Sequence, residues 1–504
     1  GDLNEVHRME TFDMDATNGF LDSKWYHLYC SVQRCNSALR VLNAATDEQV
    51  NGRVSRIAEM KVLRAHYYFE LSRLFNKIPY FDENVEISQY PDIPNNEFTR
   101  DEILSMLAKE MLDAAEQLPA SQPEVGRIHK YIALAYAAKI KLYQAYQQDE
   151  ITHAVTSINK ELLREVVSLC DQVTASNRYG LLDDFQGLDL VTNENGKESV
   201  FAIQYSMNDG TESAGRINWS NLLNSPGGGS PYGGDGFFLP SQDLINAYQT
   251  DANGLPDFNY QSKSDYSWAV LNNGVYTLQN TTPNVDPRLD FVVGRPTITW
   301  KTYPDKPCEG WVRDKETYGY NCAKRFWVSP ESSDMFNGWP WGASQLNWQI
   351  IRYADILLWK AEALIELNEG NGLETARDLI NQIRNRARNS AYVKDFNDHS
   401  KYAANYLVNP YPADVWNQDY ARQALRWETR LEKALEGERF FDLVRWGIVE
   451  TTMNNYITAE SDNRIYYANA HFTGGKDEYY PVPNNQYGFS GGKYVQNPGY
   501  APFN

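Results

Sequence analysis

The sequence predicts a mainly α-helical fold: a tetratricopeptide-like superhelix of helical hairpins with one large loop-rich insertion that contains short strands. Small and apolar residues recur at spacings of three and four over long stretches, which is the period of amphipathic helices. The segment 180–345 lacks this period and holds 18 of the 32 glycines and 7 of the 13 tryptophans. A glycine-rich segment without helical periodicity is typical of loops and short strands. We therefore expect a helical scaffold that carries the segment 180–345.

The clearest predicted hairpin lies between residues 350 and 387. Apolar or small residues recur there at 350, 353, 354, 357, 361 and 364, and again at 373, 376, 380, 383 and 387. The glycine-containing residues 368–372 between the two runs supply the turn. A two-helix unit of roughly 34 residues belongs to the tetratricopeptide size class, which stacks into superhelices.

The same period predicts helices elsewhere in the chain. In order, they are 24–44, 53–75, 100–118, 127–147, 158–176, 346–367, 373–389 and 419–446. Within the insertion, alternation predicts a strand at 199–204, and a short helix is predicted at 241–248. The apolar stripes of the long helices are assigned to core packing.

Three parts of the chain follow from this pattern. Residues 1–179 form an N-terminal helical-hairpin scaffold, and residues 180–345 form the loop-rich insertion that is the candidate ligand region. Residues 346–504 form C-terminal helical hairpins and terminal loops, which we expect to pack with 1–179 as one body.

Charge narrows the classes of partner. The chain has 66 acidic residues against 47 lysines and arginines, a formal net charge of −19 at pH 7. We expect no nucleic-acid partner, because phosphate binding needs a basic surface; neutral ligands fit best.

No run of 18 apolar residues occurs, so no membrane-spanning helix is predicted. Residues 1–4 are polar and lack the segments of a secretory signal.

Five cysteines are too few for a disulfide scaffold, and none forms a CxxC pair. Cys30 and Cys35 lie in a predicted helix and are expected to be buried thiols. For Cys308 and Cys322 two alternatives stay open, a disulfide that closes the short loop between them or two free thiols.

Four separated segments carry motifs in a fixed order. They are IAEMKVLRAHYYFEL (57–71) leading to Ile78 and Pro79; GFFLPSQDL (236–244) with DPRLD (286–290); RYADILLWKAEA (352–363) with INQIRNRA (380–387); and EGERFFDLVRWG (436–447) with YPVP (480–483) and QNPGY (496–500). Each motif alone is weak. Together they resemble the SusD/RagB family of outer-membrane nutrient-binding lipoproteins.

The resemblance implies a non-catalytic, cell-surface glycan-binding protein. Such a protein captures oligosaccharides or polysaccharide and delivers them to a SusC-like TonB-dependent outer-membrane transporter. The resemblance also implies a place on the extracellular face of the outer membrane, with membrane contact through a lipid anchor that is not present in this sequence.

Other functions stay open beside this one. Helical repeats often bind peptides or serve as interaction scaffolds, and a glycoside hydrolase needs only two properly spaced acids. The sequence has no HExxH, P-loop or GxSxG motif and no GxGxxG motif after a predicted strand. We therefore expect no enzymatic activity and no cofactor.

Aromatic residues of the insertion are the candidate ligand site. A sugar ring has an apolar face and a rim of hydroxyls, so its receptor needs flat aromatic rings beside paired donors and acceptors. The aromatic candidates in Pro-, Gly- and Lys-containing loops are Trp300, Trp311, Trp339 and Trp341, with Tyr232, Trp268 and Tyr318 in similar settings. Arg313, Asp314 and Asn337 are the hydrogen-bonding candidates. Interior packing is the alternative for each tryptophan.

Two local segments have alternatives of their own. Trp339 and Trp341, on either side of Pro340, either stack on a sugar or clamp the insertion onto the helix at 352. In an extended segment their rings would point to opposite faces, unless Pro340 lies in a turn. In the loop 11–18, Asp13 and Asp15 either hydrogen-bond sugar hydroxyls, hold a structural calcium ion or remain solvated.

Overall fold

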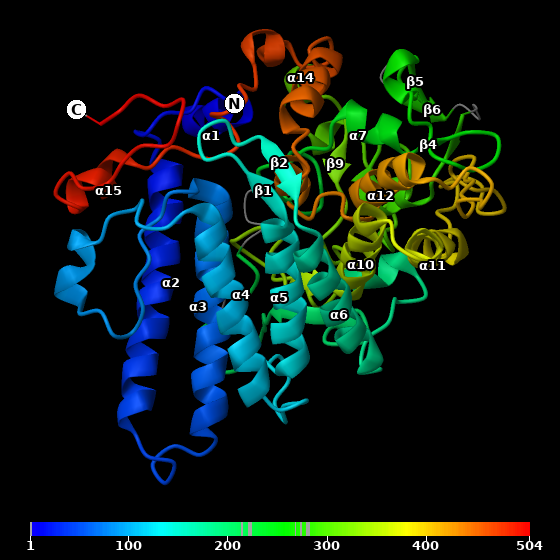
Figure 1. Ribbon diagram of the computed structural model, residues 1–504. Helices are drawn as coiled ribbons and strands as arrows, with labels where there is room; N and C mark the ends of the chain where they lie inside the picture. Colours follow the sequence, from blue (N-terminus) through cyan, green and yellow to red (C-terminus); the bar gives the residue numbers. More distant parts are fainter. Residues whose placement is uncertain are drawn as a thin grey trace. The chain divides into compact units, whose positions relative to one another are not determined.

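The computed structural model describes residues 3–212, 215–219, 224–267, 269–272, 275–278 and 283–503 (Figure 1). It is mainly helical with short two-stranded sheets, which confirms the predicted fold class. The chain divides into two compact units. The first unit comprises Gly1–Asn177, Phe440–Ile457 and Asn469–Asn504, and the second comprises Arg178–Arg439 and Thr458–Ala468.

Five long helices build most of the first unit. They are α2 (Gly19–Ala44), α3 (Arg53–Phe75), α4 (Arg100–Gln117), α5 (Lys130–Ala145) and α6 (Lys160–Ala175). Successive members pack side by side, from blue to teal in Figure 1. Side chains cap three of them, because Asn18, Thr99 and Asn159 each accept a hydrogen bond from the first turn of the helix that follows. All five helices were predicted, with ends displaced by at most five residues.

A hairpin and shorter helices complete the first unit. They are α1 (Asn4–Glu10), the 3-10 helix η1 (Ile87–Asp92), the antiparallel strands β1 (Tyr146–Gln148) and β2 (Val155–Ile158), and α15 (Asn484–Phe489). α13 (Arg439–Arg445) and α14 (Val449–Glu460) lie largely in this unit. In the β1–β2 turn, Oδ1 of Asp149 accepts hydrogen bonds from the backbone N–H groups of Ile151 (3.0 Å) and Thr152 (2.7 Å). This Asx-type turn fixes the backbone of the residues that follow it.

The helical part of the second unit is a hairpin with a third helix packed on it. α10 (Tyr353–Leu367) and α11 (Gly372–Asn389) form the predicted hairpin, and α12 (Gln418–Glu432) contacts both. The predicted strand at 199–204 is β3 (Ser199–Ile203), and the predicted short helix at 241–248 is α7 (Gln242–Ala247).

Two predicted helices needed correction. The helix predicted at 346–367 begins only at Tyr353, because residues 348–352 form β10 (Trp348–Arg352), which pairs antiparallel with β3. The helix predicted at 419–446 is broken between α12 and α13. Leu435 (φ 66°) and Gly437 (φ 80°) adopt left-handed backbone there, which an α-helix does not contain.

The remaining elements of the second unit are short. The strand pairs are β4 (Gln249–Thr250) with β7 (Asn284–Val285), β5 (Ala269–Asn272) with β6 (Val275–Leu278), and β8 (Val293–Gly294) with β9 (Cys322–Ala323), all antiparallel. The helices are α8 (Arg288–Val292), α9 (Lys315–Tyr318), and the 3-10 helices η2 (Phe185–Asp189), η3 (Val191–Asn193), η4 (Tyr260–Ser262), η5 (Glu309–Trp311) and η6 (Ile465–Asn469).

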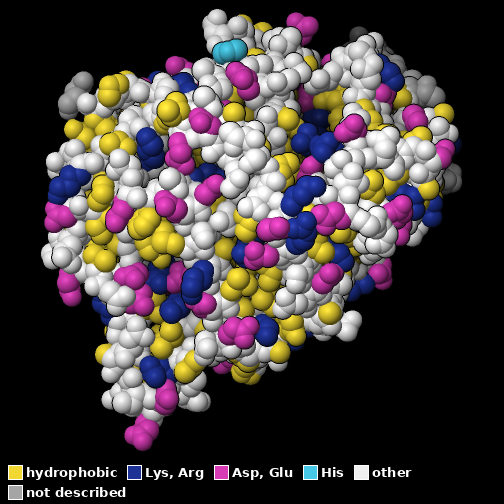
Figure 2. Space-filling view, in the orientation of Figure 1, with side chains coloured by type: hydrophobic (Ala, Val, Ile, Leu, Met, Phe, Trp, Pro, Cys, Tyr) yellow, Lys and Arg dark blue, Asp and Glu magenta, His cyan; other side chains and the backbone are white. Residues whose placement is uncertain are grey.

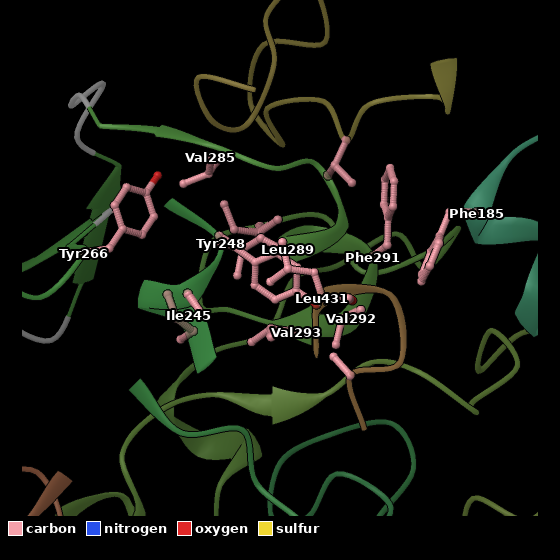
Figure 3. Close-up of a cluster of buried hydrophobic side chains, with 14 of the residues drawn as sticks. Phe185, Ile245, Tyr248, Tyr266, Val285, Leu289, Phe291, Val292, Val293 and Leu431 are labelled. Atoms are coloured by element: carbon pink, nitrogen blue, oxygen red, sulfur yellow. Dashed lines mark hydrogen bonds between the residues drawn. The ribbon is translucent and has the colours of Figure 1, made fainter. Parts of the chain in front are cut away.

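One apolar core joins the loop-rich segment to the helices of the second unit. Figure 3 shows Tyr248 and Leu289 from the loop-rich segment packed around Leu431 of α12. Because they share this core, residues 346–439 group with the loop-rich segment by their contacts. The three-part division made from composition remains a prediction.

A buried ion network fixes the ends of the same helices. Nη1 of Arg352 donates to Glu432 (2.6 Å) and to Glu198 (3.0 Å), and Arg386 pairs with both carboxylates. Burial alone would raise the pKa of Glu432, but the guanidinium groups of Arg386 and Arg352 hold it near 2. Such paired charges tolerate burial, whereas removal of one partner leaves an uncompensated charge.

Three further expectations concern the whole chain. All five cysteines are free thiols, so the disulfide between Cys308 and Cys322 does not form; Cys35 is buried and Cys30 is half-buried. Among the described residues, no helix combines the length and apolar character that crossing a membrane requires. On the face shown in Figure 2, acidic and basic side chains are interspersed rather than gathered into one charged patch.

Candidate functional site

Three predicted ligand residues lie in the interior of the second unit. Trp300 (0% exposed), Trp311 and Tyr232 are buried and pack together with Trp327, a set that we call the inner aromatic cluster. The rings of Trp300 and Trp311 meet edge to face with centroids 5.1 Å apart. This differs from the expected stacking platforms, because each ring face is covered by protein.

The inner aromatic cluster forms because residues distant in sequence make room and supply partners. The indole N–H of Trp300 donates to the hydroxyl of Tyr232 (3.0 Å), which in turn donates to the carbonyl of Val328 (2.7 Å). A Cβ atom on Gly294 would lie 2.2 Å from the Trp300 ring, so only glycine fits beside it. Burial raises the pKa of Tyr232 well above its usual value, so its hydroxyl stays protonated.

The other two predicted tryptophans lie at the surface. Trp339 is 62% exposed and Trp341 is 51% exposed. The ring of Trp339 meets that of Trp219, which is 40% exposed, edge to face with centroids 5.2 Å apart. We call these three residues the outer aromatic group. Trp219 was not predicted as a ligand residue, although it shares the loop setting of the tryptophans that were.

A tight loop presents Trp339 and Trp341. The N–H of Phe336 donates to the carbonyl of Ala343 (2.8 Å), and the N–H of Ala343 donates to the carbonyl of Pro340 (3.3 Å). Pro340 therefore lies in a turn, the condition under which both indoles can reach one ligand.

Backbone contacts hold this loop against the segment that carries Trp219. The N–H of Asn218 donates to the carbonyl of Ser344 (2.8 Å), and the side-chain amide of Asn218 donates to the carbonyl of Leu346 (3.0 Å). The hydroxyl of Ser225 donates to the carbonyl of Trp341 (3.2 Å). Hydrogen bonds thus hold in place the backbone that carries these indoles.

The predicted polar partners mostly have structural contacts. Arg313 reaches Asp235, with Nη1 3.4 Å from its carbonyl oxygen, and Asp314 caps α9 by accepting from the N–H of Thr317 (3.1 Å). Tyr318 is half-buried, and Arg464 donates to its carbonyl (2.7 Å). Asn337 is exposed in the loop before Trp339. Trp268 lies outside the described residues, and ligand contact by all these residues remains a prediction.

Asp13 and Asp15 lie in the first unit. Arg8 donates to Asp13 (3.2 Å) and to Asp15 (2.8 Å), and the Thr17 hydroxyl and N–H also donate to Asp15. The hydrogen bonds from Thr17 and Arg8 lower the pKa of Asp15 to about 2, despite partial burial. Asp15 lines a cavity of 360 Å³ together with Tyr487.

Within the part of the chain that the structure describes, no group of three or more His, Cys, Asp and Glu side chains could hold a metal ion. Oxygens of Asp13 and Asp15 already accept hydrogen bonds from Arg8 and Thr17. A calcium ion held by these two carboxylates remains a prediction.

Family models match most of the chain. Residues 197–500 match the model of the SusD family, and residues 3–142 match a SusD-like model described as starch-binding associating with outer membrane. The chain therefore belongs to the SusD family, as its four sequence motifs predicted.

Individual relatives extend this match over nearly the whole chain. A SusD-like protein of Bacteroides ovatus is 22% identical over 457 residues, which cover 86% of this chain and 67% of that protein. A SusD superfamily protein of Bacteroides vulgatus has a similar structure, with a TM-score of 0.71 and 21% identity over 99% of this chain and 90% of that one. A laminarin binding SusD-like protein has a TM-score of 0.59 and 21% identity, over 97% and 88% of the two chains.

Proposed function

We propose that this protein binds carbohydrate without catalysis and that the outer aromatic group forms the binding surface. The observation that carries the proposal is the joint exposure of Trp219, Trp339 and Trp341 on anchored loops, with two of the rings in contact. The C–H face of a sugar ring packs on an indole, and neighbouring polar groups pair with its hydroxyls. Large contiguous apolar patches on the surface of a soluble protein often mark interaction sites.

The comparisons support carbohydrate as the ligand class. One matching family model carries the description starch-binding, and one similar structure is that of a laminarin binding protein. Both are described as binding proteins. The net charge of −19 favours a neutral polymer over an anionic one, because like charges repel.

Delivery forms the second part of the proposal. The bound glycan passes to a SusC-like TonB-dependent transporter, and the protein is lipid-anchored on the extracellular face of the outer membrane. The family description, associating with outer membrane, supports this location. Affinity purification of the tagged full-length protein from outer membranes should recover a TonB-dependent transporter. Its absence under conditions that preserve outer-membrane complexes would contradict the delivery step.

Native affinity electrophoresis tests carbohydrate binding. The protein should be retarded in gels that contain one of four neutral polysaccharides, a β-glucan, a xylan, a mannan or a fructan, and no reducing ends should be released. Trp339→Ala and Trp341→Ala should each abolish or weaken retardation. Phe489→Ala is the matched control, because Phe489 is 59% exposed but belongs to the first unit.

Three outcomes would change the conclusion. If no polysaccharide retards the protein but a casein peptide digest binds to it, the peptide-receptor alternative replaces the proposal. If retardation is unchanged in both tryptophan variants, the carbohydrate site lies elsewhere in the molecule. Release of reducing ends would make the protein a glycoside hydrolase.

A further inference from the structure

The two exposed indoles of the turn at 336–343 are held in different ways. The ring of Trp339 rests edge to face on that of Trp219, with centroids 5.2 Å apart. Trp341 is held through its backbone instead. Its carbonyl accepts a hydrogen bond from the hydroxyl of Ser225 (3.2 Å), which is the one hydrogen-bond partner that Trp341 has among the described residues. The orientation of the Trp341 indole therefore depends on Ser225.

Ser225 fills a space that two glycines leave open. Its side chain is fully buried (0% exposed). A Cβ atom on Gly234 would lie 1.7 Å from the hydroxyl oxygen of Ser225, and a Cβ atom on Gly342 would lie 2.6 Å from the Cβ atom of Ser225. Gly342 also has a φ of 73°, in the left-handed region that favours glycine. The three residues thus form one close contact, and Gly342 directly follows Trp341 in the chain.

The segment 225–236, which begins with this serine, is fastened to the inner aromatic cluster. The N–H of Gly227 donates to the carbonyl of Trp311 (3.1 Å). Tyr232 belongs to the cluster, and its Cβ atom lies 3.6 Å from the place that a Cβ atom on Gly342 would take. The segment therefore connects the buried cluster to the turn that carries the exposed indoles.

This arrangement fixes an indole from the interior of the protein. Because Ser225 has no exposed surface, it does not itself contact a ligand. An indole that is already held in one orientation loses less conformational freedom when a sugar ring packs on it. An alanine at position 225 would keep the Cβ atom that packs against the two glycines and would lack the hydrogen-bond donor. The hydrogen bond to Trp341 can therefore be removed by itself.

We propose that Ser225 is a positioning residue of the carbohydrate-binding surface, which holds the Trp341 indole in place through its hydrogen bond to the Trp341 carbonyl. The affinity for carbohydrate then depends on a residue that does not touch the ligand. The effect on affinity rests on the proposed function, whereas the restraint on Trp341 can be measured without any ligand.

Fluorine NMR of the full chain labelled with 5-fluorotryptophan measures the restraint. The chain has 13 tryptophans, and the resonance that disappears in Trp341→Phe is that of Trp341. In Ser225→Ala this resonance should shift or become narrower, because the indole is no longer held and moves more freely. A Trp341 resonance that is unchanged in Ser225→Ala would overturn the proposal.

Isothermal titration with an oligosaccharide of the polymer that retards the wild type measures the affinity. Ser225→Ala should weaken binding by about threefold to tenfold, the factor that corresponds to the free energy of one hydrogen bond. In the Trp341→Ala background the same change should have no further effect, because no indole is left to position. An equal loss in both backgrounds would show a merely structural role and would overturn the proposal. If Trp341→Ala leaves no measurable binding, the fluorine spectrum decides.

Two further variants complete the test. Gly342→Ala places a Cβ atom against Ser225 from the other side and should weaken binding at least as much as Ser225→Ala, so it tests the contact even if Ser225→Ala does not fold. Wild-type affinity in both variants would overturn the proposal. Ser390→Ala is the matched control, since it removes another buried hydroxyl that donates to a carbonyl, that of Arg386 (2.9 Å). It should change neither the affinity nor the Trp341 resonance.

Failure of the proposed function would look different. A wild-type protein without affinity for any polysaccharide would refute carbohydrate binding, and the fluorine spectrum of Ser225→Ala would still decide whether Ser225 holds Trp341.

Discussion

The inner aromatic cluster and the outer aromatic group both contain tryptophans of the loop-rich segment, but those of the cluster are buried and those of the group are exposed. Trp300 has a glycine beside its ring and a tyrosine hydroxyl for its N–H, and it is fully buried. Trp339 and Trp341 follow each other around a turn and remain more than half exposed. A loop tryptophan is thus buried where tertiary partners satisfy both its ring and its N–H, and a turn can keep it at the surface.

Alanine substitution should lower the free energy of unfolding much more in the inner aromatic cluster than in the outer aromatic group. Trp300→Ala should lower the free energy of unfolding by about 3–5 kcal/mol, because it leaves a cavity among Trp311, Trp327 and Tyr232. Trp339→Ala is the matched control and should lower it by no more than about 1.5 kcal/mol, because this exposed ring loses only its edge-to-face contact with Trp219. Urea unfolding followed by far-ultraviolet circular dichroism measures both. Equal losses would show that exposure does not separate the two sets.

Removal of one hydroxyl sharpens the same comparison. Tyr232→Phe keeps the ring but leaves the N–H of Trp300 and the carbonyl of Val328 without their shared partner. The expected loss is about 1–3 kcal/mol, because both groups are buried polar atoms. Tyr402→Phe, at an exposed tyrosine, should be neutral in the same urea titration. A neutral Tyr232→Phe would mean that the hydroxyl does not contribute to burial of Trp300.

The long helices were predictable because their periodicity is local and their apolar faces are buried. The errors arose where local pattern and tertiary context disagree. Ile350 and Ile351 extend the apolar period of α10 backwards, but they lie in β10, where Ile351 pairs with Phe201 of β3, which is distant in sequence. Leu435 carries no signal for left-handed backbone, whereas Gly437 nearby was a signal that could have marked the break between α12 and α13.

The candidate site was predictable only as a set of loop tryptophans. Their sequence neighbours do not tell Trp300 from Trp339, because the partner that buries Trp300, Tyr232, is 68 residues away. Trp219 was missed for the same reason, since its place beside Trp339 depends on contacts of Asn218 with residues 344 and 346.

The contact between Trp219 and Trp339 gives the smallest expected effect and decides whether the outer aromatic group acts as a unit. If Trp219 supports the ring of Trp339 while Trp339 contacts the sugar, Trp219→Ala should weaken carbohydrate binding by about 0.5–1.5 kcal/mol, the usual value of an edge-to-face pair. The double variant should then bind no more weakly than Trp339→Ala alone, because the supporting ring has nothing left to orient. Isothermal titration with an oligosaccharide of the polymer that retards the wild type measures all four proteins. Fully additive losses would instead show that both indoles contact the sugar independently, so that Trp219 binds the sugar itself and does not only support Trp339.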